Sequence, residues 1–465
     1  MGERWDAVVV GAGPNGLTAA ARLATAGRRV LVLEAAPTIG GGARTALLGP
    51  GAVYDVCSAA HPFGATSPAF EELGLDRHGL EWAHAPTALA HPFDDGTAAV
   101  LERDLADTVR GLGDDGRRWD RLLGWMVRDW NELRHLVLAP LIDAARHHPA
   151  RLARLGVVAV LPAVVASRMF RDREARALLV GLAAHTGASL GQPTTAGVAL
   201  ALAAATHAGG MPVALGGSRA IVDALASVVR DAGGEIVCDH PVKRFAELPP
   251  ADAVLLDLTP GCAAELLGRR RPRWRNGVAA WKLDLVLSEP MPWTADSCRQ
   301  AATVHLGGEA KLVARAERTT ARGGLPAGPY VIVVQPSLAD PGRAPGRHVV
   351  WAYRHVPNGS EDATATAGIE AQFDRFAPGW RDVVEHRRVT TALDYAAYNR
   401  GYEGGDIAGG AMTAWQAVAR PRLALDPYRL AGDGVWLCSQ STPPGPGVHG
   451  MCGWHAAGSV LRHQS

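Results

Sequence analysis

One stretch near the start of the chain, WDAVVVGAGPNGLTAAARLATAGRRVLVLEAA (residues 5–36), restricts the possible folds more than any other part. Residues 7–10 form an unbroken apolar run, which is typical of a parallel strand buried on both faces. An alanine-rich helix is predicted over residues 17–26 and a second buried strand over residues 30–33. Three glycines lie between the first strand and the helix, namely Gly11, Gly13 and Gly16. This order predicts a βαβ unit that binds a dinucleotide.

The three glycines and their neighbours have separate physical roles. The first glycine permits a tight turn, the second lets the backbone approach a pyrophosphate, and the third lets the helix pack on the strand. The free N–H groups and the dipole of the helix favour phosphate binding. Glu34, at the end of the second strand, is placed to accept hydrogen bonds from a ribose diol. The predicted cofactor contacts of this unit are Gly11, Gly13, Pro14, Asn15, Gly16, Glu34 and Ala35.

The same glycine spacing recurs at Gly111, Gly113 and Gly116. No apolar strand precedes this second triplet and two aspartates lie inside it, so the other elements of a phosphate-binding loop are missing. We predict a surface loop there.

A further glycine cluster indicates which dinucleotide is bound. Gly40, Gly41, Gly42 and Arg44 follow the second strand, where a long flavin dinucleotide needs more backbone donors and a cation. Together with Glu34, this segment resembles the large FAD-containing superfamily of amine oxidases and phytoene desaturases, whose mark is a glutamate followed by a G-G-x-R type segment. The resemblance implies FAD as the cofactor, with Gly41, Gly42 and Arg44 among its contacts.

Composition and charge exclude several classes of function. Apolar residues make up 48% and charged residues 20%, with a net charge of +1, so we expect a globular protein without an electrostatic reason to bind nucleic acid. The six cysteines form no C-x-x-C pair, and no metal-ligand spacing is evident, so no metal is predicted. The longest apolar run, residues 155–166, is too short to span a membrane. We expect a cytoplasmic protein and leave open a peripheral contact with a membrane.

The rest of the chain alternates between two kinds of pattern. Residues 100–206 carry apolar side chains at three- and four-residue spacing, which is typical of helices. Residues 210–260 return to strand-and-helix units with a helix capped by Ser218, and the resemblance implies that Val242 holds the adenine through its backbone. Residues 278–357 alternate between apolar and polar side chains, which predicts an antiparallel sheet with one covered face.

These patterns predict an α/β fold, in which a Rossmann-type FAD-binding domain carries an inserted α+β substrate-binding domain of antiparallel sheet plus helices. The FAD-binding domain is expected from residues 1–90, 208–275 and 420–465. The substrate-binding domain is expected from residues 91–207 and 276–419.

The end of the chain holds one more glycine-rich loop. A strand at residues 434–440 leads into STPPGPGVHG (441–450), and a helix is expected over residues 451–461. Ligands of an open parallel sheet sit outside the carboxyl ends of its strands, so this loop can meet the same cofactor from its other end. A helix N-terminus there stabilises the negative charge that develops on a reduced flavin. The predicted contacts are Ser439, Gly447, Val448 and His449.

With that tail, the resemblance covers nearly the whole chain and narrows to the phytoene dehydrogenase-related group. Segments that carry it include GGGARTALLGPGAVYDVCSAAHPFG (40–64) and YNRGYEGGDIAGGAM (398–412). The group contains carotenoid desaturases and pyridine nucleotide-disulphide oxidoreductase-like proteins. The resemblance implies a non-covalent FAD, a hydrophobic substrate and removal of hydride from carbon. The chain departs from the group at Pro443 and Pro446, where a histidine and a glycine are usual, so no general base is available at position 443.

Few side chains qualify as catalytic groups. His449 lies beside the predicted flavin edge, where it either acts on flavin or substrate or only caps the last helix. His61 follows the pyrophosphate segment and either faces the same cavity or is structural. His185 and His207 are expected in the helical core. Hydride transfer needs mainly alignment in a dry pocket, so few polar catalytic residues are expected. Four tryptophans either line that pocket or pack in the core: Trp281, Trp351, Trp415 and Trp454.

The sequence therefore predicts an FAD-dependent, phytoene desaturase-like oxidase or dehydrogenase that acts on a hydrophobic isoprenoid or secondary-metabolite substrate. Two alternatives stay open: a flavin-dependent isomerase or cyclase, and a flavin-free lipid-carrier-binding protein of the same fold. No second strand-led dinucleotide fingerprint is found, which leaves oxygen or a quinone as the electron acceptor. A homo-oligomer is also left open.

Overall fold

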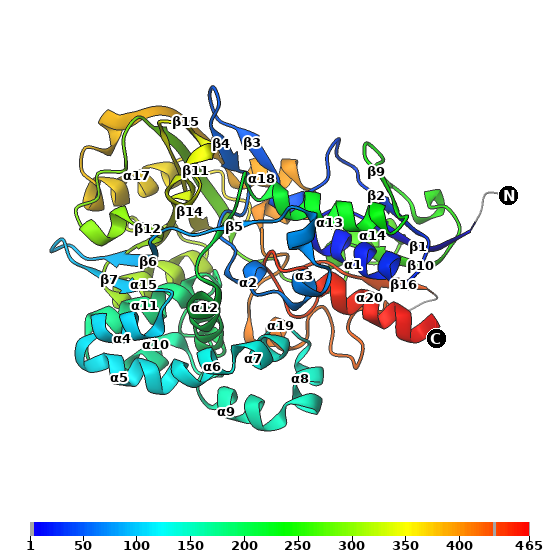
Figure 1. Ribbon diagram of the computed structural model, residues 1–465, viewed down its shortest axis with the longest axis horizontal. Helices are drawn as coiled ribbons and strands as arrows, with labels where there is room; N and C mark the ends of the chain where they lie inside the picture. Colours follow the sequence, from blue (N-terminus) through cyan, green and yellow to red (C-terminus); the bar gives the residue numbers. More distant parts are fainter. Residues whose placement is uncertain (1–3, 431–433, 465) are drawn as a thin grey trace.

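Five parallel strands form a sheet at the end of the molecule that lies on the right of Figure 1. The structure, a computed structural model, describes residues 4–430 and 434–464. The strand order is β16-β10-β1-β2-β9, and every neighbouring pair is parallel. The strands are β1 (Trp5–Val10), β2 (Val30–Leu33), β9 (Glu235–Val237), β10 (Ala251–Leu256) and β16 (Val435–Leu437). This sheet confirms the predicted Rossmann-type architecture.

Helices cover both faces of the parallel sheet. Strand side chains alternate between the faces, so Val9 packs with three helices on one face while Val254 packs with α14 (Pro260–Leu266) on the other. Both faces are apolar, as a parallel sheet between two helical layers requires. The three helices of the first face are α1 (Pro14–Thr25), α13 (Arg219–Asp231) and α20 (Met451–Gln464).

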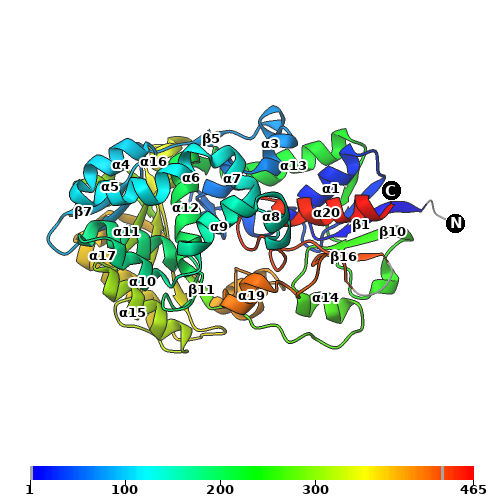
Figure 2. The ribbon, with the colours of Figure 1, turned by 90° about the horizontal axis from the view of Figure 1, so that it is seen from below.

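Helices α1 and α20, which come from opposite ends of the chain, pack side by side (Figure 2). A Cβ atom built on Gly453 would lie 1.8 Å from the carbonyl oxygen of Asn15, so this approach requires glycine. The Arg22 guanidinium stacks 4.0 Å from the ring centroid of Trp454 and donates to the Trp454 carbonyl at 2.6 Å. The C-terminal helix is therefore part of the N-terminal βαβ unit's own packing.

A second sheet, of seven strands, lies at the other end of the molecule (Figure 1). Its order is β15-β11-β14-β13-β12-β6-β7, and its neighbours are antiparallel except for the parallel pair β12 and β6. The sheet extends beyond the predicted residues 278–357 at both ends, and the boundary expected at residue 90 falls inside β6. The strands are β6 (Thr87–Pro92), β7 (Ala98–Leu101), β11 (Ala279–Leu287), β12 (Ala301–Leu306), β13 (Val331–Val334), β14 (His348–Val356) and β15 (Val384–Thr390).

The prediction of a sheet with one covered face is wrong, because both faces are covered. Strand β11 alternates as expected, but its polar side chains are covered as well: Lys282 and Asp284 are both 0% exposed. Lys282 Nζ lies 2.9 Å from Asp284 Oδ2 and donates to the carbonyl oxygens of Asp55 and Val56 at 2.7 Å each. The N-terminal region therefore covers the polar face of the sheet and supplies partners for the buried lysine.

Helices from the predicted helical region cover the seven-stranded sheet on one face, and α17 (Thr364–Phe376) packs on the other face. The helices of that region are α4 (Leu105–Gly111), α5 (Gly116–Trp119), α6 (Trp125–Arg128), α7 (Trp130–Val137), α8 (Leu141–His147), α9 (Pro149–Ala159), α10 (Ala163–Ala166), α11 (Arg173–Ala184) and α12 (Thr195–Gly209). The remaining short elements include α2 (Pro62–Ala65), α3 (Pro68–Glu72), α15 (Ala310–Ala321), α16 (Pro336–Ala339), α18 (Ala392–Tyr398), α19 (Ala414–Val418), and the paired strands β3 (Thr45–Leu47) with β4 (Val53–Asp55) and β5 (Trp82–Ala83) with β8 (Val213–Ala214).

The second glycine triplet is helical and not the predicted surface loop. Gly111 ends α4 and Gly116 begins α5. Between them, the fully buried Asp115 accepts hydrogen bonds from the backbone N–H groups of Arg171 and Asp172, at 2.7 Å each. The acid inside this triplet thus satisfies backbone donors of a distant segment, residues 171–172.

Ser218 precedes α13 as predicted, but its side chain does not cap that helix. Its hydroxyl donates to the Ser58 carbonyl at 2.6 Å, and its N–H donates to Asp55 Oδ1 at 2.7 Å. Asp55 also forms a buried ion pair with Arg343, with 2.5 Å between Oδ2 and Nη1. These contacts join α13, the β3–β4 hairpin and the loop after β13.

Within residues 4–430 and 434–464, no single helix is both long and apolar enough to cross a membrane. Helix α9 and residues 163–169 reach that length and composition only as a pair, and the pair is bent by 83°. Val157 and Val160 of this region are exposed at 73% and 55%.

Candidate cofactor site

The chain order of the parallel sheet reverses between β1 and β10. From β1 the sheet continues outward through β2 to β9, whereas on the other side β10 leads to β16. Open parallel sheets bind ligands in the crevice outside the carboxyl ends of the strands at such a reversal. Gly11 follows β1 directly and Asp257 follows β10 directly. The predicted glycine loop therefore lies where this class of fold binds its ligand.

The geometry of the glycine loop agrees with the roles predicted for it. Gly11 has a φ of +107°, a conformation that favours glycine. A Cβ atom on Gly16 would lie 2.1 Å from the Gly11 carbonyl oxygen, so the helix packs as closely as predicted. In the first turn of α1, the side-chain oxygen of Asn15 is buried without a hydrogen-bond partner among the described residues.

Glu34 faces the glycine loop from the end of β2. Its Oε2 accepts from the N–H of Ala12 at 2.7 Å, and its Oε1 accepts from the N–H of Ala36 at 3.0 Å. This is the position from which a carboxylate reaches a ribose diol. Arg44 lies 3.3 Å from Glu34 Oε1 and donates to the Thr38 carbonyl at 2.5 Å, so its guanidinium braces residues 38–44.

Two tyrosines that the sequence analysis did not single out pack against the second glycine cluster. The Tyr398 hydroxyl donates to the Gly41 carbonyl at 2.6 Å and accepts from Arg44 Nη1 at 3.2 Å. A Cβ atom on Gly42 would lie 2.2 Å from the hydroxyl oxygen of the buried Tyr402. Gly42 is therefore required by this packing. Both tyrosines lie in the segment 398–412, which the sequence analysis uses only as one of the stretches that carry the family resemblance.

The C-terminal loop returns to the same edge of the parallel sheet. The Ser439 hydroxyl donates to the carbonyl of Leu258, two residues beyond β10, at 2.6 Å. Gly450 has a φ of +69°, and a Cβ atom on it would lie 2.3 Å from Thr18 Oγ1 of α1. The structure thus brings together the two separated halves of the predicted cofactor site. The loop also contains the predicted contacts Gly447 and Val448.

His449 is buried two residues before the start of α20. Its Nδ1 accepts the N–H of Met451 at 3.1 Å, and the backbone carbonyls of Gly445 and Pro446 are further hydrogen-bond partners of the ring. Burial lowers the pKa of His449 to about 4 and outweighs these carbonyls, so the imidazole is neutral at pH 7. The geometry is that of a capping residue, which favours the structural alternative over a general base.

We expect His449→Ala to lower the free energy of unfolding by about 1 kcal/mol, because it removes the acceptor for the first-turn N–H. His449→Asn should keep most of that stability, since an asparagine side-chain oxygen can accept the backbone N–H two residues further on. Urea unfolding of the three proteins measures both effects. If His449→Asn folded with full stability but lost substrate-dependent flavin reduction, the capping role would be insufficient and a catalytic role would be required.

His61 is 3% exposed and begins α2. Its Nε2 lies 2.8 Å from the hydroxyl oxygen of Ser218, which donates its own proton to the Ser58 carbonyl. Nε2 of His61 therefore carries a proton, and burial lowers the pKa of this histidine to about 4. A Cβ atom on Gly64 would lie 2.8 Å from the Val448 carbonyl oxygen, so α2 contacts the C-terminal loop. His61 lies near the predicted site as a neutral hydrogen-bond donor.

The other residues singled out from the sequence have varied surroundings. Val242 is half-buried on apolar side chains of β1, β2 and β10, and Ala35 is exposed. His207 accepts from Trp119 Nε1 at 3.1 Å, and His185 Nε2 lies 2.9 Å from His305 Nε2. The four tryptophans form no common pocket: Trp281 and Trp351 are buried, Trp415 is 68% exposed, and Trp454 stacks under Arg22.

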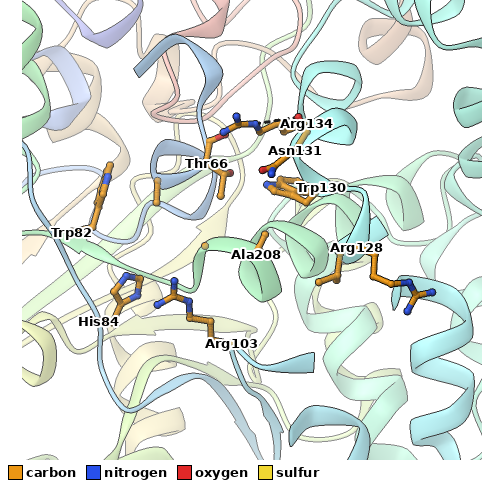
Figure 3. Close-up of a pocket in the computed structure, with 12 residues that line it drawn as sticks. Thr66, Trp82, His84, Arg103, Arg128, Trp130, Asn131, Arg134 and Ala208 are labelled. Atoms are coloured by element: carbon orange, nitrogen blue, oxygen red, sulfur yellow. Dashed lines mark hydrogen bonds between the residues drawn. The ribbon is translucent and has the colours of Figure 1, made fainter. Parts of the chain in front are cut away.

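A cleft of about 480 Å³ opens beside α2 (Figure 3). Figure 3 shows His84 and Arg103 next to each other on one side, with Trp130, Asn131 and Arg134 across from them. No carboxylate is among the described residues that line it. The cleft is aromatic and cationic, which differs from the apolar pocket expected for a hydrophobic substrate. None of the predicted cofactor contacts lines this cleft, although Ala65 and Thr66, the two residues after Gly64, do.

Comparison with known proteins agrees with this geometry. Residues 9–73 match the model of the NAD(P)-binding Rossmann-like domain. The chain is 27% identical to pyridine nucleotide-disulfide oxidoreductase domain-containing protein 2 of Mus musculus, over 98% of this chain and 93% of that protein. It is 32% identical to hydroxyneurosporene desaturase of Cereibacter sphaeroides, over 51% of this chain and 50% of the desaturase.

A solved structure decides the fold. Wild-type putrescine oxidase bound to putrescine superposes with a TM-score of 0.60 over 99% of both chains, at 16% identity. The chain therefore has the same overall fold as putrescine oxidase. The resemblance to the amine oxidases seen in the sequence is confirmed at the level of the fold.

The residues at the crevice fit the dinucleotide of the amine oxidase-like superfamily. Glu34 lies at the position for a ribose, the first turn of α1 holds the unpartnered Asn15 oxygen, and the C-terminal loop flanks the same edge. Besides Tyr398 and Tyr402, sequence reasoning missed Asp257. Its signal was available, because an aspartate that directly follows an apolar parallel strand, as in AVLLD, must lie at the carboxyl edge of the sheet.

Proposed function

We propose that this protein is an FAD-dependent oxidoreductase that removes a hydride from a C–H bond of a hydrophobic substrate. One observation carries the proposal: glycine-rich loops from the two ends of the chain lie at one edge of one parallel sheet, with α20 packed on α1. An extended dinucleotide that begins at Glu34 and runs toward residues 439–450 would have partners at both ends. The desaturase relative is consistent with hydride removal from carbon.

The chain's own residues would bind and align the reactants. Glu34 would accept hydrogen bonds from a ribose, and the N-terminus of α1 would face the pyrophosphate. The N-terminus of α20 would stabilise negative charge at the far end of the cofactor. When bound, FAD supplies the two-electron acceptor for hydride, while the accompanying proton leaves to solvent. His449 and His61 would position their loops, since both are neutral and engaged in hydrogen bonds.

The cleft beside α2 is our proposed approach for the substrate. Trp82 and Trp130 offer apolar surface, and Arg103 adds a cationic group next to His84. Such a lining suits an amphipathic molecule whose body is apolar and whose end is polar or anionic. Helix α2 links the cleft to the C-terminal loop, because Gly64 contacts Val448 and the next two residues line the cleft.

The proposal is tested by titrating the purified protein with FAD. We expect one FAD per chain, the absorption bands of a bound flavin, and bleaching of these bands by a reductant under anaerobic conditions. Glu34→Ala should weaken FAD binding by at least about tenfold, because it removes a charged hydrogen-bond acceptor for the ribose. Glu71→Ala, which alters a surface acid near the cleft, serves as the control and should bind FAD normally.

Three outcomes separate the proposal from its alternatives. Rapid reoxidation of the reduced protein by oxygen or by a quinone supports an oxidoreductase and identifies the acceptor. Turnover by fully reduced protein without any acceptor would indicate an isomerase or cyclase instead. A protein that takes up no FAD would contradict the proposal and leave the flavin-free lipid-carrier-binding alternative.

A further inference from the structure

The carboxylate of Asp257 occupies the glycine loop where a pyrophosphate is expected. Its Oδ2 accepts the N–H of Gly16 at 3.0 Å, and the N–H of Gly13 also donates to the carboxylate. A Cβ atom on Gly13 would lie 2.7 Å from the same oxygen. Two backbone donors of the predicted phosphate loop are thus already bound to an anion from the protein itself.

Among the residues that the structure describes, none places a cation in contact with Asp257. Asp257 interacts electrostatically with four titratable side chains and with the N-terminus of α1. The side chains are those of Glu34, Tyr402, Cys438 and Cys452. Burial raises the pKa of the tyrosine and of both thiols, so these three groups are neutral near pH 7. Glu34 adds a second negative charge on the side where the ribose is expected.

Asp257 is a weaker acid than an exposed aspartate, because its carboxyl group is buried. Burial raises its pKa to about 7, with Glu34 as a further cause and the two backbone N–H groups opposing the shift. A dinucleotide would bring two phosphate charges into this crevice, and like charges in a site of low dielectric repel strongly. The ionised carboxylate and the pyrophosphate would therefore compete for the same N–H groups.

We propose that Asp257 must be protonated for a dinucleotide to bind, so that cofactor binding takes up one proton. The protonated acid keeps its place against Gly11 and Gly16 and donates its O–H toward the phosphate oxygens. This inference rests on the proposed flavin function and adds to it a control of cofactor retention by pH. Because only the protonated fraction is competent, the apparent Kd for FAD rises about tenfold per pH unit above pH 7.

The experiment is FAD titration of the apoprotein between pH 6 and pH 8.5, followed by flavin fluorescence, for the natural protein and Asp257→Asn. Asparagine has the shape of the protonated acid, accepting from Gly16 and offering an N–H to phosphate. We expect log Kd of the natural protein to be flat below pH 7 and to rise with a slope approaching one above it. Asp257→Asn should stay flat, and should bind FAD about tenfold more tightly than the natural protein at pH 8.

Calorimetry in two buffers of different ionisation enthalpy gives an independent readout that needs no variant. At pH 8 the natural protein should take up close to one proton per FAD bound. Equal pH slopes for the natural protein and Asp257→Asn, or no proton uptake at pH 8, would overturn this inference while leaving the flavin function intact. If neither protein bound FAD at any pH, both the inference and the proposed function would fall.

Discussion

Replacing Gly453 by alanine should remove FAD binding and lower the free energy of unfolding by about 2–3 kcal/mol, despite the usual preference of helices for alanine. The new Cβ atom would lie 1.8 Å from the Asn15 carbonyl oxygen, 2.7 Å from the Asn15 carbonyl carbon and 3.0 Å from the Ala19 nitrogen. All three are backbone atoms of α1, so α20 must move away from that helix. The C-terminal loop would move with it, and the two halves of the site would separate.

Gly458→Ala is the matched control for this substitution. It lies on the same helix, but the three atoms nearest to its new Cβ atom belong to the Arg22 guanidinium, the end of a flexible side chain that can shift slightly, and not to the backbone of α1. We expect FAD affinity to be unchanged and stability to change by less than about 1 kcal/mol. Chemical unfolding of both variants measures their stability, and FAD titration measures their affinity for the cofactor. Normal FAD binding by Gly453→Ala would show that contact between α1 and α20 is not needed to form the site.

The second large effect is expected at the buried ion pair of the seven-stranded sheet. Lys282→Met should cost about 3–5 kcal/mol, because it leaves the Asp284 carboxylate buried without its lysine partner and removes the lysine's hydrogen bonds to the Asp55 and Val56 carbonyls. Burial lowers the pKa of the lysine and raises that of Asp284 to about 6, while their mutual attraction opposes both shifts. Burial therefore destabilises each charge, and the ion pair with the other residue offsets part of that cost.

The double variant Lys282→Met with Asp284→Leu isolates the pair interaction. Removing both charges should recover most of the lost stability, because no uncompensated ion remains. Thermal and urea unfolding of the two single variants and the double variant complete the cycle. If the costs of the single variants simply added, the lysine and the aspartate would not be stabilising each other, and the description of this face would be wrong.

The βαβ unit could be predicted from sequence because its signals are local. The apolar run before Gly11, the glycine spacing and Glu34 lie within one short segment, and the structure has β1, α1 and β2 close to the predicted bounds. The last helix was also visible, since the loop after a strand and the N-terminus of a helix share one edge of the sheet. The structure adds that strands from separate parts of the chain form one parallel sheet, and the likeness to putrescine oxidase extends over nearly the whole chain.

What the sequence could not reveal depends on contacts between distant segments. The alternation of apolar and polar residues in β11 is present in the structure. The sequence pattern does not tell whether the Lys282 ammonium is hydrogen-bonded by water or by the Asp55 carbonyl, 227 residues away. The sequence predicts a surface loop around Asp115, because nothing nearby in the sequence indicates that its hydrogen-bond donors are the N–H groups of residues 171–172. The sequence places Asp257 at the edge of the sheet, but its hydrogen bond with Gly16 joins residues 241 positions apart and follows only from the structure. Solvent exposure is decided by tertiary packing, which periodicity does not encode.

The most direct test of the central claim is hydrogen exchange of backbone amides with and without FAD. If one dinucleotide lies between the two chain ends, FAD should slow exchange both in residues 11–17 and in residues 445–454. Protection of the N-terminal segment alone, with the C-terminal loop unchanged, would contradict the claim that the two ends of the chain form one site.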